Sequence, residues 1–310
     1  MKNILVTGAA GFVGSHLITK LISQGNSVIG IDNLGLGSIS NIENSLEENN
    51  FRFYELDILN DSFKNIISNY KFDEVYHLAA NSDIKAGSQD VTRDLNLTFL
   101  STFEVLRYLS KLGTKKYFFS STSAIFGDLG EMKIDENSAP LKPQSFYGAA
   151  KLSSEAYLSA FSHMFDLDIC ILRFPNVLGA NLTHGVVYDF IQKLKENKTV
   201  LHILGNGKQR KPYIHISDLL AAIEIGMQQN DKFGVYNVCS DGQTSVDEIA
   251  NIVCEEMGLS DVKYEYSGQN IGWKGDVPIY DYNTEKIRQK GWSPRMNSNQ
   301  TVRKTVQENL

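Results

Sequence analysis

The 310-residue sequence predicts an α/β protein with a parallel β-sheet covered by helices on both faces, followed by a smaller mixed α/β lobe. In the first half, short runs rich in β-branched residues alternate with longer segments of helical periodicity, which is typical of parallel strands joined by crossover helices. After Arg173 this alternation loosens. We therefore expect one lobe over residues 1–173 and a second over residues 174–310. The boundary should be interleaved, because no linker-like segment separates the halves.

Each expected element rests on its periodicity and length. Short apolar runs in the first half predict six buried strands: Asn3–Thr7, Ser27–Ile31, Phe51–Glu55, Glu74–His77, Lys116–Ser120 and Asp168–Leu172. Apolar residues spaced three and four apart predict helices between them, at Val13–Ser23 and Thr98–Lys111. The second half predicts a strand at Tyr213–Ile216 and helices at Val186–Asn197, Leu219–Gln229, Val246–Met257 and Thr284–Gln289. Ser217 and Asp218 are candidates to cap the helix that follows them.

The composition limits the classes of function. Hydrophobic residues make up 42% of the chain and the net charge is −6, which argues against a nucleic acid or an anionic membrane as partner. No apolar stretch approaches the roughly 20 residues that span a bilayer. Cys170, Cys239 and Cys254 are far apart and form no C-x-x-C pair, so we expect free, buried thiols and a cytoplasmic protein. The six histidines show no metal-ligand spacing, so we expect no metal.

A glycine-rich loop follows the first predicted strand. It reads Gly8-Ala9-Ala10-Gly11-Phe12-Val13-Gly14 and leads into a predicted helix. Glycines permit a tight turn and a close approach of the backbone to a pyrophosphate, and the free N–H groups of the helix N-terminus attract its charge. The strand, loop and helix in this order predict a Rossmann-like dinucleotide site. Alternatively, the glycines form only a turn.

Acidic residues after the next strands fit the same ligand. Asp32 ends the second strand, where a carboxylate can accept both adenosine ribose hydroxyls and repel a 2′-phosphate, so NAD is favoured over NADP. Asp57, after the third strand, can bind the adenine amino group or cap a helix near Asn60. After the fourth strand, the small residues Ala79 and Ala80 would let the backbone lie along the cofactor. Asn81 and Ser82 could equally be turn residues.

A tyrosine and a lysine four residues apart predict the chemistry. Tyr147 and Lys151 share one helix face and follow the hydroxyl-rich end of the fifth strand, which includes Thr122. A free tyrosine has a pKa of about 10, but a nearby ammonium and an oxidised nicotinamide both favour the phenolate. Tyr147 could then take a proton from a sugar hydroxyl while hydride leaves the same carbon. The alternative is a packed tyrosine and a solvated lysine.

With these motifs the chain resembles the extended short-chain dehydrogenase/reductase family, and within it the nucleotide-sugar epimerases, particularly UDP-glucose (UDP-galactose) 4-epimerases. The resemblance covers nearly the whole chain. The segments that carry it are Gly8–Gly14, Asp32-Asn33-Leu34, Asp57-Ile58, Leu78-Ala79-Ala80, Asn96, Ser120–Gly127, Tyr147–Lys151, Arg173–Gly179, Tyr213–Asp218 and Gly275–Tyr280.

The resemblance implies site residues and a quaternary state. It implies that NAD is bound by Gly8, Gly11, Phe12, Val13, Gly14, Asp32, Asn33, Leu34, Asp57, Ile58, Leu78, Ala79, Ala80, Asn96, Ser120, Tyr147, Lys151 and Pro175. It implies that the substrate is bound by Ser82, Thr122, Tyr147, Asn176, Arg210, Lys211, Asp276 and Tyr280. Thr122, Tyr147 and Lys151 would be catalytic. Members of the family usually form homodimers through two helices, here near Leu95–Lys111 and Ser153–Met164.

Three comparisons with the family concern the reaction and the substrate. Related dehydratases and decarboxylases carry acidic residues directly after the threonine, where this chain has Ser123 and Ala124. Without that acid or base, reversible oxidation at one carbon remains, which is epimerisation. Related epimerases have arginines where this chain has Lys211 and the Trp273-Lys274 segment, and lysine lacks the bidentate geometry of arginine. Tyr280 is either a residue that limits the width of the sugar pocket or a core tyrosine.

Three hypotheses follow. The first is a UDP-hexose 4-epimerase that oxidises C4 transiently and returns hydride without stereospecificity. The second, of the same class, is an epimerase or reductase of another nucleotide sugar, such as a uronate, an aminosugar or a non-UDP sugar. The third is a non-catalytic dinucleotide-binding module, against which the presence of both Tyr147 and Lys151 argues.

Overall fold

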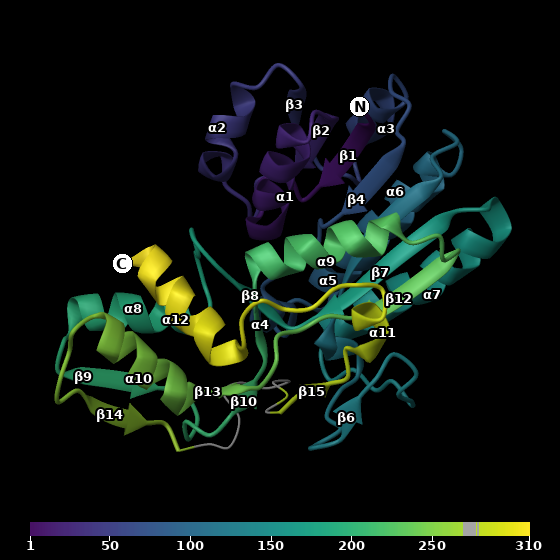
Figure 1. Ribbon diagram of the computed structural model, residues 1–310. Coiled ribbons are helices and arrows are strands. Elements are labelled where there is room, and N and C mark those ends of the chain that lie inside the picture. Colours follow the sequence, from purple (N-terminus) through teal and green to yellow (C-terminus); the bar gives the residue numbers. More distant parts are fainter. Residues whose placement is uncertain (269–276, 278) are drawn as a thin grey trace. The chain divides into compact units, whose positions relative to one another are not determined.

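The structure, a computed structural model, describes residues 1–268, 277 and 279–310. These residues form two compact units (Figure 1). The first unit comprises residues 1–125, 145–173 and 223–236, and the second comprises residues 126–144, 174–222 and 237–310. The chain crosses between the units at Arg173 and at four other points, so the two units interleave along the sequence.

The first unit is built on a seven-stranded sheet with the strand order β12–β7–β5–β4–β1–β2–β3. Its strands are β1 (Asn3–Thr7), β2 (Ser27–Asp32), β3 (Phe51–Glu55), β4 (Glu74–His77), β5 (Lys116–Thr122), β7 (Asp168–Phe174) and β12 (Phe233–Asn237). The pairs β1–β2, β1–β4, β2–β3 and β4–β5 are parallel. All six predicted strands are present and the predicted doubly wound α/β class is confirmed. β12 was not predicted from the sequence.

Helices connect these strands. They are α1 (Phe12–Ser23), η1 (Ile39–Asn41), α2 (Glu43–Leu46), α3 (Asp61–Ile67), α4 (Ile84–Gly87), α5 (Val91–Asp94), η2 (Leu95–Leu100), α6 (Ser101–Leu109), η3 (Ser123–Ile125), α7 (Phe146–Phe165) and the second half of α9 (Ile216–Gln228). The helix predicted from Thr98 begins earlier, at Leu95, because a π-helical turn, η2, precedes α6.

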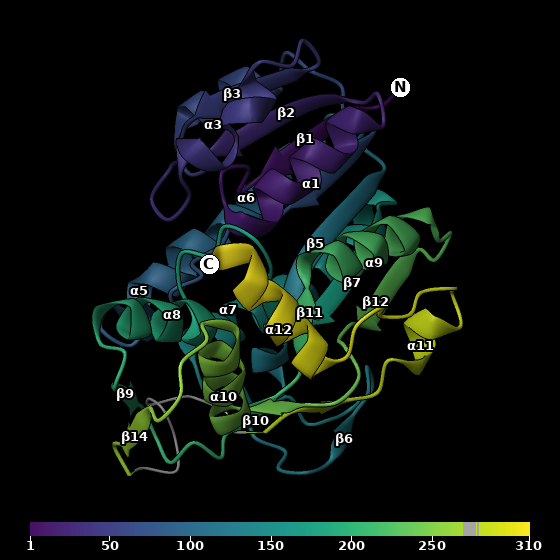
Figure 2. The ribbon, with the colours of Figure 1, turned by 60° about the vertical axis from the view of Figure 1, so that its left-hand side comes forward.

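Both faces of the sheet are covered, and alternate residues of β7 show this. Ile169 and Ile171 belong to a cluster with side chains from α3, α6 and α7. Cys170 and Leu172 point to the other face, where they lie against Gly226 of α9. Figure 2 shows α1 and α9 in front of the strands in that view. Burial on both faces explains why these strands are almost continuously apolar.

The strand register brings the predicted site residues to one edge of the sheet. Thr7 pairs with Ile31 and with His77, and His77 pairs with Phe119. The residues that follow these positions are therefore neighbours at the carboxyl edge. This edge is where ligands bind in open α/β sheets.

The second unit consists of short strands and helices. Its elements are β6 (Lys133–Ile134), β8 (Asn176–Leu178), α8 (Val186–Glu196), β9 (Val200–Ile203), β10 (Arg210–Lys211), β11 (Tyr213–His215), β13 (Thr244–Ser245), α10 (Val246–Glu256), β14 (Lys263–Tyr266), β15 (Asp281–Tyr282), α11 (Glu285–Arg288) and α12 (Ser298–Asn309). β8 pairs with β11 and β9 with β14 in parallel. Apolar side chains of α8, α10 and α12 form its core.

One predicted helix cap is wrong. Ser217 and Asp218 lie inside α9, which begins at Ile216. Asp218 is buried, its carboxylate accepts a hydrogen bond from the Arg295 backbone (3.0 Å), and its carbonyl accepts one from Trp292 (3.0 Å). These long-range partners replace the local cap. Within the described part of the chain, no helix is both long enough and apolar enough to cross a bilayer.

Candidate active site

The loop after β1 has no room for side chains at two of its glycines. Gly8 has φ +72°, and a Cβ there would lie 2.7 Å from the Ala79 nitrogen. A Cβ on Gly14 would lie 2.0 Å from the Gly8 carbonyl oxygen. Gly11 is the N-cap of α1 and provides no side-chain cap, so the first N–H groups of the helix remain available to an anion. The loop therefore fits the pyrophosphate of a dinucleotide.

Asp32 is held at the end of β2 by backbone donors. Its two carboxylate oxygens accept hydrogen bonds from the N–H groups of Ala10 (3.0 Å) and Leu34 (2.8 Å). Partial burial raises the pKa of Asp32, and these backbone bonds oppose that shift. A carboxylate has about four acceptor positions, so it can still accept ribose hydroxyls. Asn33 connects this turn to the next strand end, because its amide donates to Asp57 (3.3 Å).

Asp57 has a local role in this structure. Its other carboxylate oxygen accepts from the Leu59 backbone (2.8 Å), and the N-cap of α3 is Asn60. Asp57 is half-buried and the following Ile58 is buried. The carboxylate therefore shapes the turn after β3, and its proposed bond to adenine stays a prediction.

The segment after β4 is held by a polar network that sequence patterns did not reveal. Leu78, Ala79 and Ala80 are half-buried, as a backbone lying along a ligand requires, and Ser82 is exposed. The buried Asn81 donates through its amide to Asp94 (3.0 Å), and its backbone N–H donates to the Thr98 hydroxyl (3.1 Å). Asn96, the predicted cofactor residue, is half-buried on the same π-helical turn, two residues before Thr98.

Tyr147 and Thr122 come together as predicted. Tyr147 lies in the first turn of α7, whose N-cap Ser145 accepts from Gly148 N–H (3.1 Å). Burial raises the pKa of the Tyr147 phenol, the charge of Asp94 raises it further, and a hydrogen bond with Thr122 lowers it. The phenol is therefore protonated at neutral pH until positive charge is brought near it.

Lys151 is one turn further along α7 and is 1% exposed. Its ammonium donates to the carbonyl oxygen of Ser120 (2.6 Å) and lies 4.5 Å from the centre of the Phe119 ring and 5.9 Å from that of Tyr147. Burial lowers the pKa of Lys151 to about 7, while Glu155 and Asp94 raise it. Tyr147, Lys151, Thr122 and Ser120 thus form one cluster at the carboxyl edge of the sheet.

Ser121 anchors the middle of this cluster to an ion pair. Its hydroxyl donates to Glu155 Oε1. Arg173 binds the same carboxylate through Nε (3.0 Å to Oε1) and Nη2 (2.6 Å to Oε2), and both side chains are 7% exposed. Through these bonds the Glu155–Arg173 pair links α7 and β7 to Ser121 of β5.

His77 lies beneath the site and stays neutral. It is fully buried, with Nδ1 2.7 Å from the Thr7 hydroxyl and Nε2 3.0 Å from the Thr102 hydroxyl. Burial lowers the pKa of His77 to about 3, and the charge of Lys151 acts in the same direction. The ring therefore joins β1, β4 and α6 without adding positive charge.

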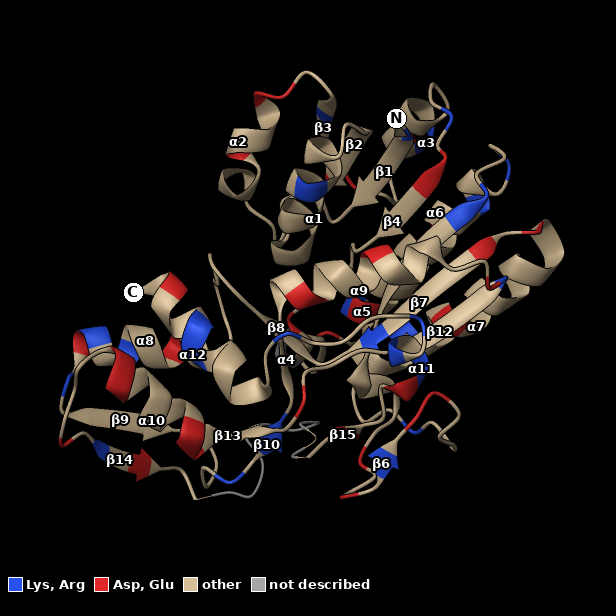
Figure 3. Cartoon of the chain, in the orientation of Figure 1, with Lys and Arg blue, Asp and Glu red and all other residues tan. Residues whose placement is uncertain are grey.

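The remaining predicted residues lie in the second unit. Pro175 is buried and Asn176 is exposed at the start of β8. Arg210 and the half-buried Lys211 form β10, which Figure 3 shows as a basic segment. Arg210 pairs with Glu131 (2.8 Å). Tyr280 is 5% exposed and stacks on Tyr282, with 6.2 Å between ring centres. Asp276, with the neighbouring Trp273, Lys274 and Gly275, lies outside the described residues.

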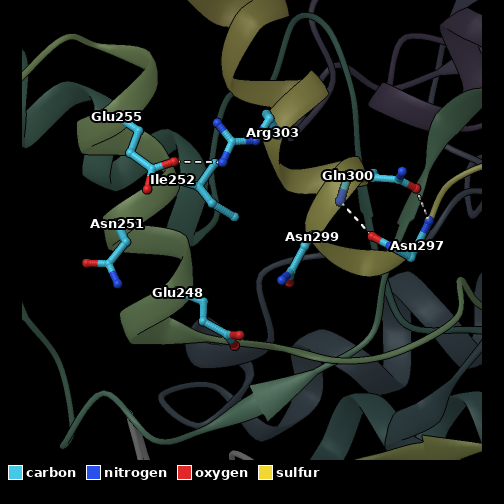
Figure 4. A pocket seen from close by; sticks show the side chains of 8 residues that line it. All are labelled: Glu248, Asn251, Ile252, Glu255, Asn297, Asn299, Gln300 and Arg303. Atoms are coloured by element: carbon cyan, nitrogen blue, oxygen red, sulfur yellow. Dashed lines mark hydrogen bonds and ion pairs between the residues drawn. The ribbon is translucent and has the colours of Figure 1, made fainter.

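The second unit contains a pocket of about 320 Å³ (Figure 4). It is lined by Glu248, Asn251, Ile252, Glu255, Asn297, Asn299, Gln300 and Arg303. Its polar groups bind one another: Arg303 pairs with Glu255 (2.7 Å), and the Asn297 and Gln300 side chains cap α12. It contains none of the predicted site residues.

Comparison with known proteins decides the family. The model of the NAD dependent epimerase/dehydratase family matches residues 4–239. The chain belongs to this family. A UDP-glucose 4-epimerase from Thermotoga maritima is 31% identical with a TM-score of 0.89, covering 99% of this chain and 98% of that one. A putative UDP-glucose 4-epimerase from Methanocaldococcus jannaschii is 29% identical over 98% of this chain and 97% of its own length. A UDP-glucuronic acid 4-epimerase from Bacillus cereus is 25% identical, with a TM-score of 0.89 and 99% and 98% coverage.

Membership confirms the predicted resemblance, the enzymatic nature of the protein and its NAD cofactor. The glycine loop and Asp32 fit that cofactor, as argued above. Sequence reasoning missed three groups near the chemistry: Asp94 with Asn81, Glu155 with Arg173, and His77. Two of them could have been suspected from their places in the sequence, because Glu155 follows Lys151 by one helical turn and His77 ends a predicted buried strand. Asp94 gave no comparable signal.

Proposed function

We propose that this enzyme is a UDP-hexose 4-epimerase. The observation that carries the proposal is the cluster of Tyr147, Lys151 and Thr122 at the carboxyl edge of the sheet, in a chain with Ser123 and Ala124 directly after the threonine. The similarity to two UDP-glucose 4-epimerases supports the UDP-hexose, while the similarity to a UDP-glucuronic acid 4-epimerase makes a uronate the second candidate.

In the proposed mechanism Tyr147 moves the proton. Its phenolate oxygen takes the proton of the sugar C4 hydroxyl and later returns it to the same oxygen, and the face of C4 that receives the hydride decides the configuration of the product. Bound NAD supplies the hydride acceptor and then the hydride donor. The Thr122 hydroxyl hydrogen-bonds the sugar oxygen and holds it in line with Tyr147. The ammonium of Lys151 stabilises the phenolate, whose formation burial otherwise opposes.

The same residues argue against elimination or decarboxylation. Either reaction needs a further acid or base beside the threonine. Ser123 is buried in η3, and Ala124 has no titratable group and donates its N–H to the Thr122 hydroxyl (3.2 Å). This pair favours a reaction in which one proton and one hydride leave and return, which is epimerisation.

Groups of the second unit are proposed to bind the substrate. An epimerase must let its sugar turn over, so binding should rest on the nucleotide and the diphosphate. We assign this to Asn176, whose amide can donate a hydrogen bond, and to Arg210 and Lys211, whose positive charges suit a diphosphate. Tyr280 is buried against Tyr282, which favours the alternative that it packs in the core and sets the pocket wall only indirectly.

We also propose that the enzyme is a homodimer. An aromatic series runs along η2, α6 and α7: Phe99 and Phe103 lie 5.1 and 5.8 Å from Tyr157, and Phe161 lies 5.2 Å from Phe165. Leu95, Tyr157, Met164 and Phe165 expose large apolar surface beside it. A second copy offering the same face would cover this surface. Light scattering should give twice the monomer mass, and Met164→Glu with Phe165→Glu should give the monomer.

The decisive experiment follows the sugar protons by NMR. Purified enzyme with catalytic NAD is incubated separately with UDP-glucose and UDP-galactose. Both should reach one equilibrium mixture, and Tyr147→Phe should lower kcat by about 10²-fold or more because general base catalysis is lost. Tyr70→Phe, which removes a hydroxyl that is hydrogen-bonded to Tyr54 and Arg52 and lies outside the predicted site residues, should remain active. If the enzyme epimerises UDP-glucuronate but not UDP-glucose, the proposed UDP-hexose substrate is wrong and a uronate takes its place. Net consumption of NADH would refute the proposal that the enzyme is an epimerase.

A further inference from the structure

Two buried carboxylates on different elements, Glu155 and Asp94, act electrostatically on Lys151, and within the described part of the chain only Glu155 forms an ion pair with an arginine. Glu155 lies one turn further along α7. It is engaged by the guanidinium of Arg173 and by the hydroxyl of Ser121, so its charge is already balanced. The other carboxylate is Asp94, at the end of α5.

Asp94 is buried, and only one of its two carboxylate oxygens has a hydrogen-bond partner among the described residues. It is 1% exposed, and its Oδ1 accepts from the Asn81 amide (3.0 Å). Among the described residues its Oδ2 has no hydrogen-bond partner. The backbone of Gly87 closes this side, since a Cβ there would lie 2.1 Å from Oδ2. A buried carboxylate oxygen without a partner is costly, and such groups in native proteins call for a functional reason.

We propose that Asp94 is a positioning residue whose negative charge keeps Lys151 protonated inside the buried site. The proposal rests on the proposed function, because a protonated Lys151 is what the Tyr147 phenolate requires. Asp94 lies on α5, which packs against α7, the helix that carries Tyr147 and Lys151. It touches neither reacting group and acts through its charge.

Four described groups act on Lys151 or lie near it: Asp94 from α5, Glu155 and Tyr147 from its own helix, and the neutral His77 from β4. Asp94 is influenced by Asn81, Arg93, Asp83 and Lys151, and its charge acts in turn on Tyr147.

The pKa values of Asp94, Lys151 and Tyr147 depend on one another. Burial raises the pKa of Asp94, which the Asn81 bond and the charges of Arg93 and Lys151 oppose. The charge of Asp94 in turn raises the pKa of both Lys151 and Tyr147. Removing that charge should therefore lower both values together.

The test is an NMR titration of ¹³C-labelled lysine side chains in the NAD-free protein. The Lys151 signal is assigned by its loss in Lys151→Met. In Asp94→Asn, the pKa of Lys151 should fall by on the order of one unit. Asp83→Asn, which removes a neighbouring exposed carboxylate, should leave it unchanged. An unchanged Lys151 titration in Asp94→Asn would overturn the proposal. If that variant does not fold, Asn81→Ser should lower the Lys151 pKa by favouring the neutral form of Asp94.

A second measurement separates this proposal from a structural role. The proposed mechanism requires an ionised Tyr147 and a protonated Lys151, so in the NAD-bound enzyme Tyr147 should set the acid limb of the pH profile of kcat/KM and Lys151 the alkaline limb. In Asp94→Asn both limbs should move to lower pH. If Asp94 had only a structural role, kcat/KM would fall at every pH and the positions of both limbs would stay the same. The NMR titration needs no turnover, so it tests this inference independently of the proposed function. The proposed function fails if the wild-type enzyme epimerises none of the sugars supplied.

Discussion

Replacing Glu155 by Gln tests how strongly the first unit depends on one buried ion pair. Arg173 binds both oxygens of Glu155, and each side chain is 7% exposed. Arginine stays protonated in proteins, so Glu155→Gln leaves a buried guanidinium without a counter-charge. Breaking a buried pair in this way costs about 3–5 kcal/mol, and a domain has about 5–15 kcal/mol in all. We therefore expect the variant to lose about a fifth or more of its free energy of unfolding.

Urea unfolding followed by circular dichroism measures this loss. The double variant Glu155→Gln with Arg173→Met should recover part of it, because removing both charges also removes the cost of burying them. Lys232→Met is the matched control: it breaks an exposed ion pair with Asp166 and Asp168 and should have a much smaller effect. If Glu155→Gln loses less than about 1 kcal/mol, as a surface pair would, the buried-pair reasoning is refuted.

Three further predictions follow. Gly14→Ala would place a Cβ 2.0 Å from the Gly8 oxygen, so NAD affinity measured by calorimetry should fall at least about tenfold, with no change in the substrate's nucleotide affinity. Asp32→Asn removes the charge that repels a 2′-phosphate, so the ratio of NAD to NADP affinity should fall; an unchanged ratio would contradict the role of Asp32. His77 has a folded pKa of about 3 against about 6.5 when unfolded, so its contribution to stability is complete above pH 6.5 and is lost as pH falls toward 3. His77→Asn should remove up to about 1.4 kcal/mol per pH unit of that slope in urea titrations between pH 4 and 6.5, and an unchanged slope would show that other groups cause it.

The sequence predicted those features that depend on neighbouring residues. The strand–loop–helix around Gly8 and the pair Tyr147–Lys151 are local patterns, and both have the predicted geometry. β12 was missed because Gly234 and Asn237 interrupt its pattern, so only Phe233, Val235 and Tyr236 carry a strand signal. The bonds of Asn81 to Asp94 and Thr98 were missed because they bridge 13 and 17 residues through a π-helical turn. No periodicity rule encodes such a turn.

The charges around Lys151 explain why these unpredicted residues matter for the chemistry. His77 is fully buried near Lys151, and a protonated imidazole there would compete for the same negative charge; its low pKa keeps it neutral. Glu155 could hold the lysine proton by itself, but Arg173 balances it. Lys151 then depends on Asp94 to remain an ammonium, because burial lowers its pKa and the net value is about 7 even with both carboxylates present. The same carboxylate makes the phenolate of Tyr147 harder to form. Asp94 therefore has two opposing effects on the proposed reaction: it keeps Lys151 protonated, and it hinders the ionisation of Tyr147. We expect Tyr147 to ionise only when the positive charge of bound NAD⁺ is added to the site.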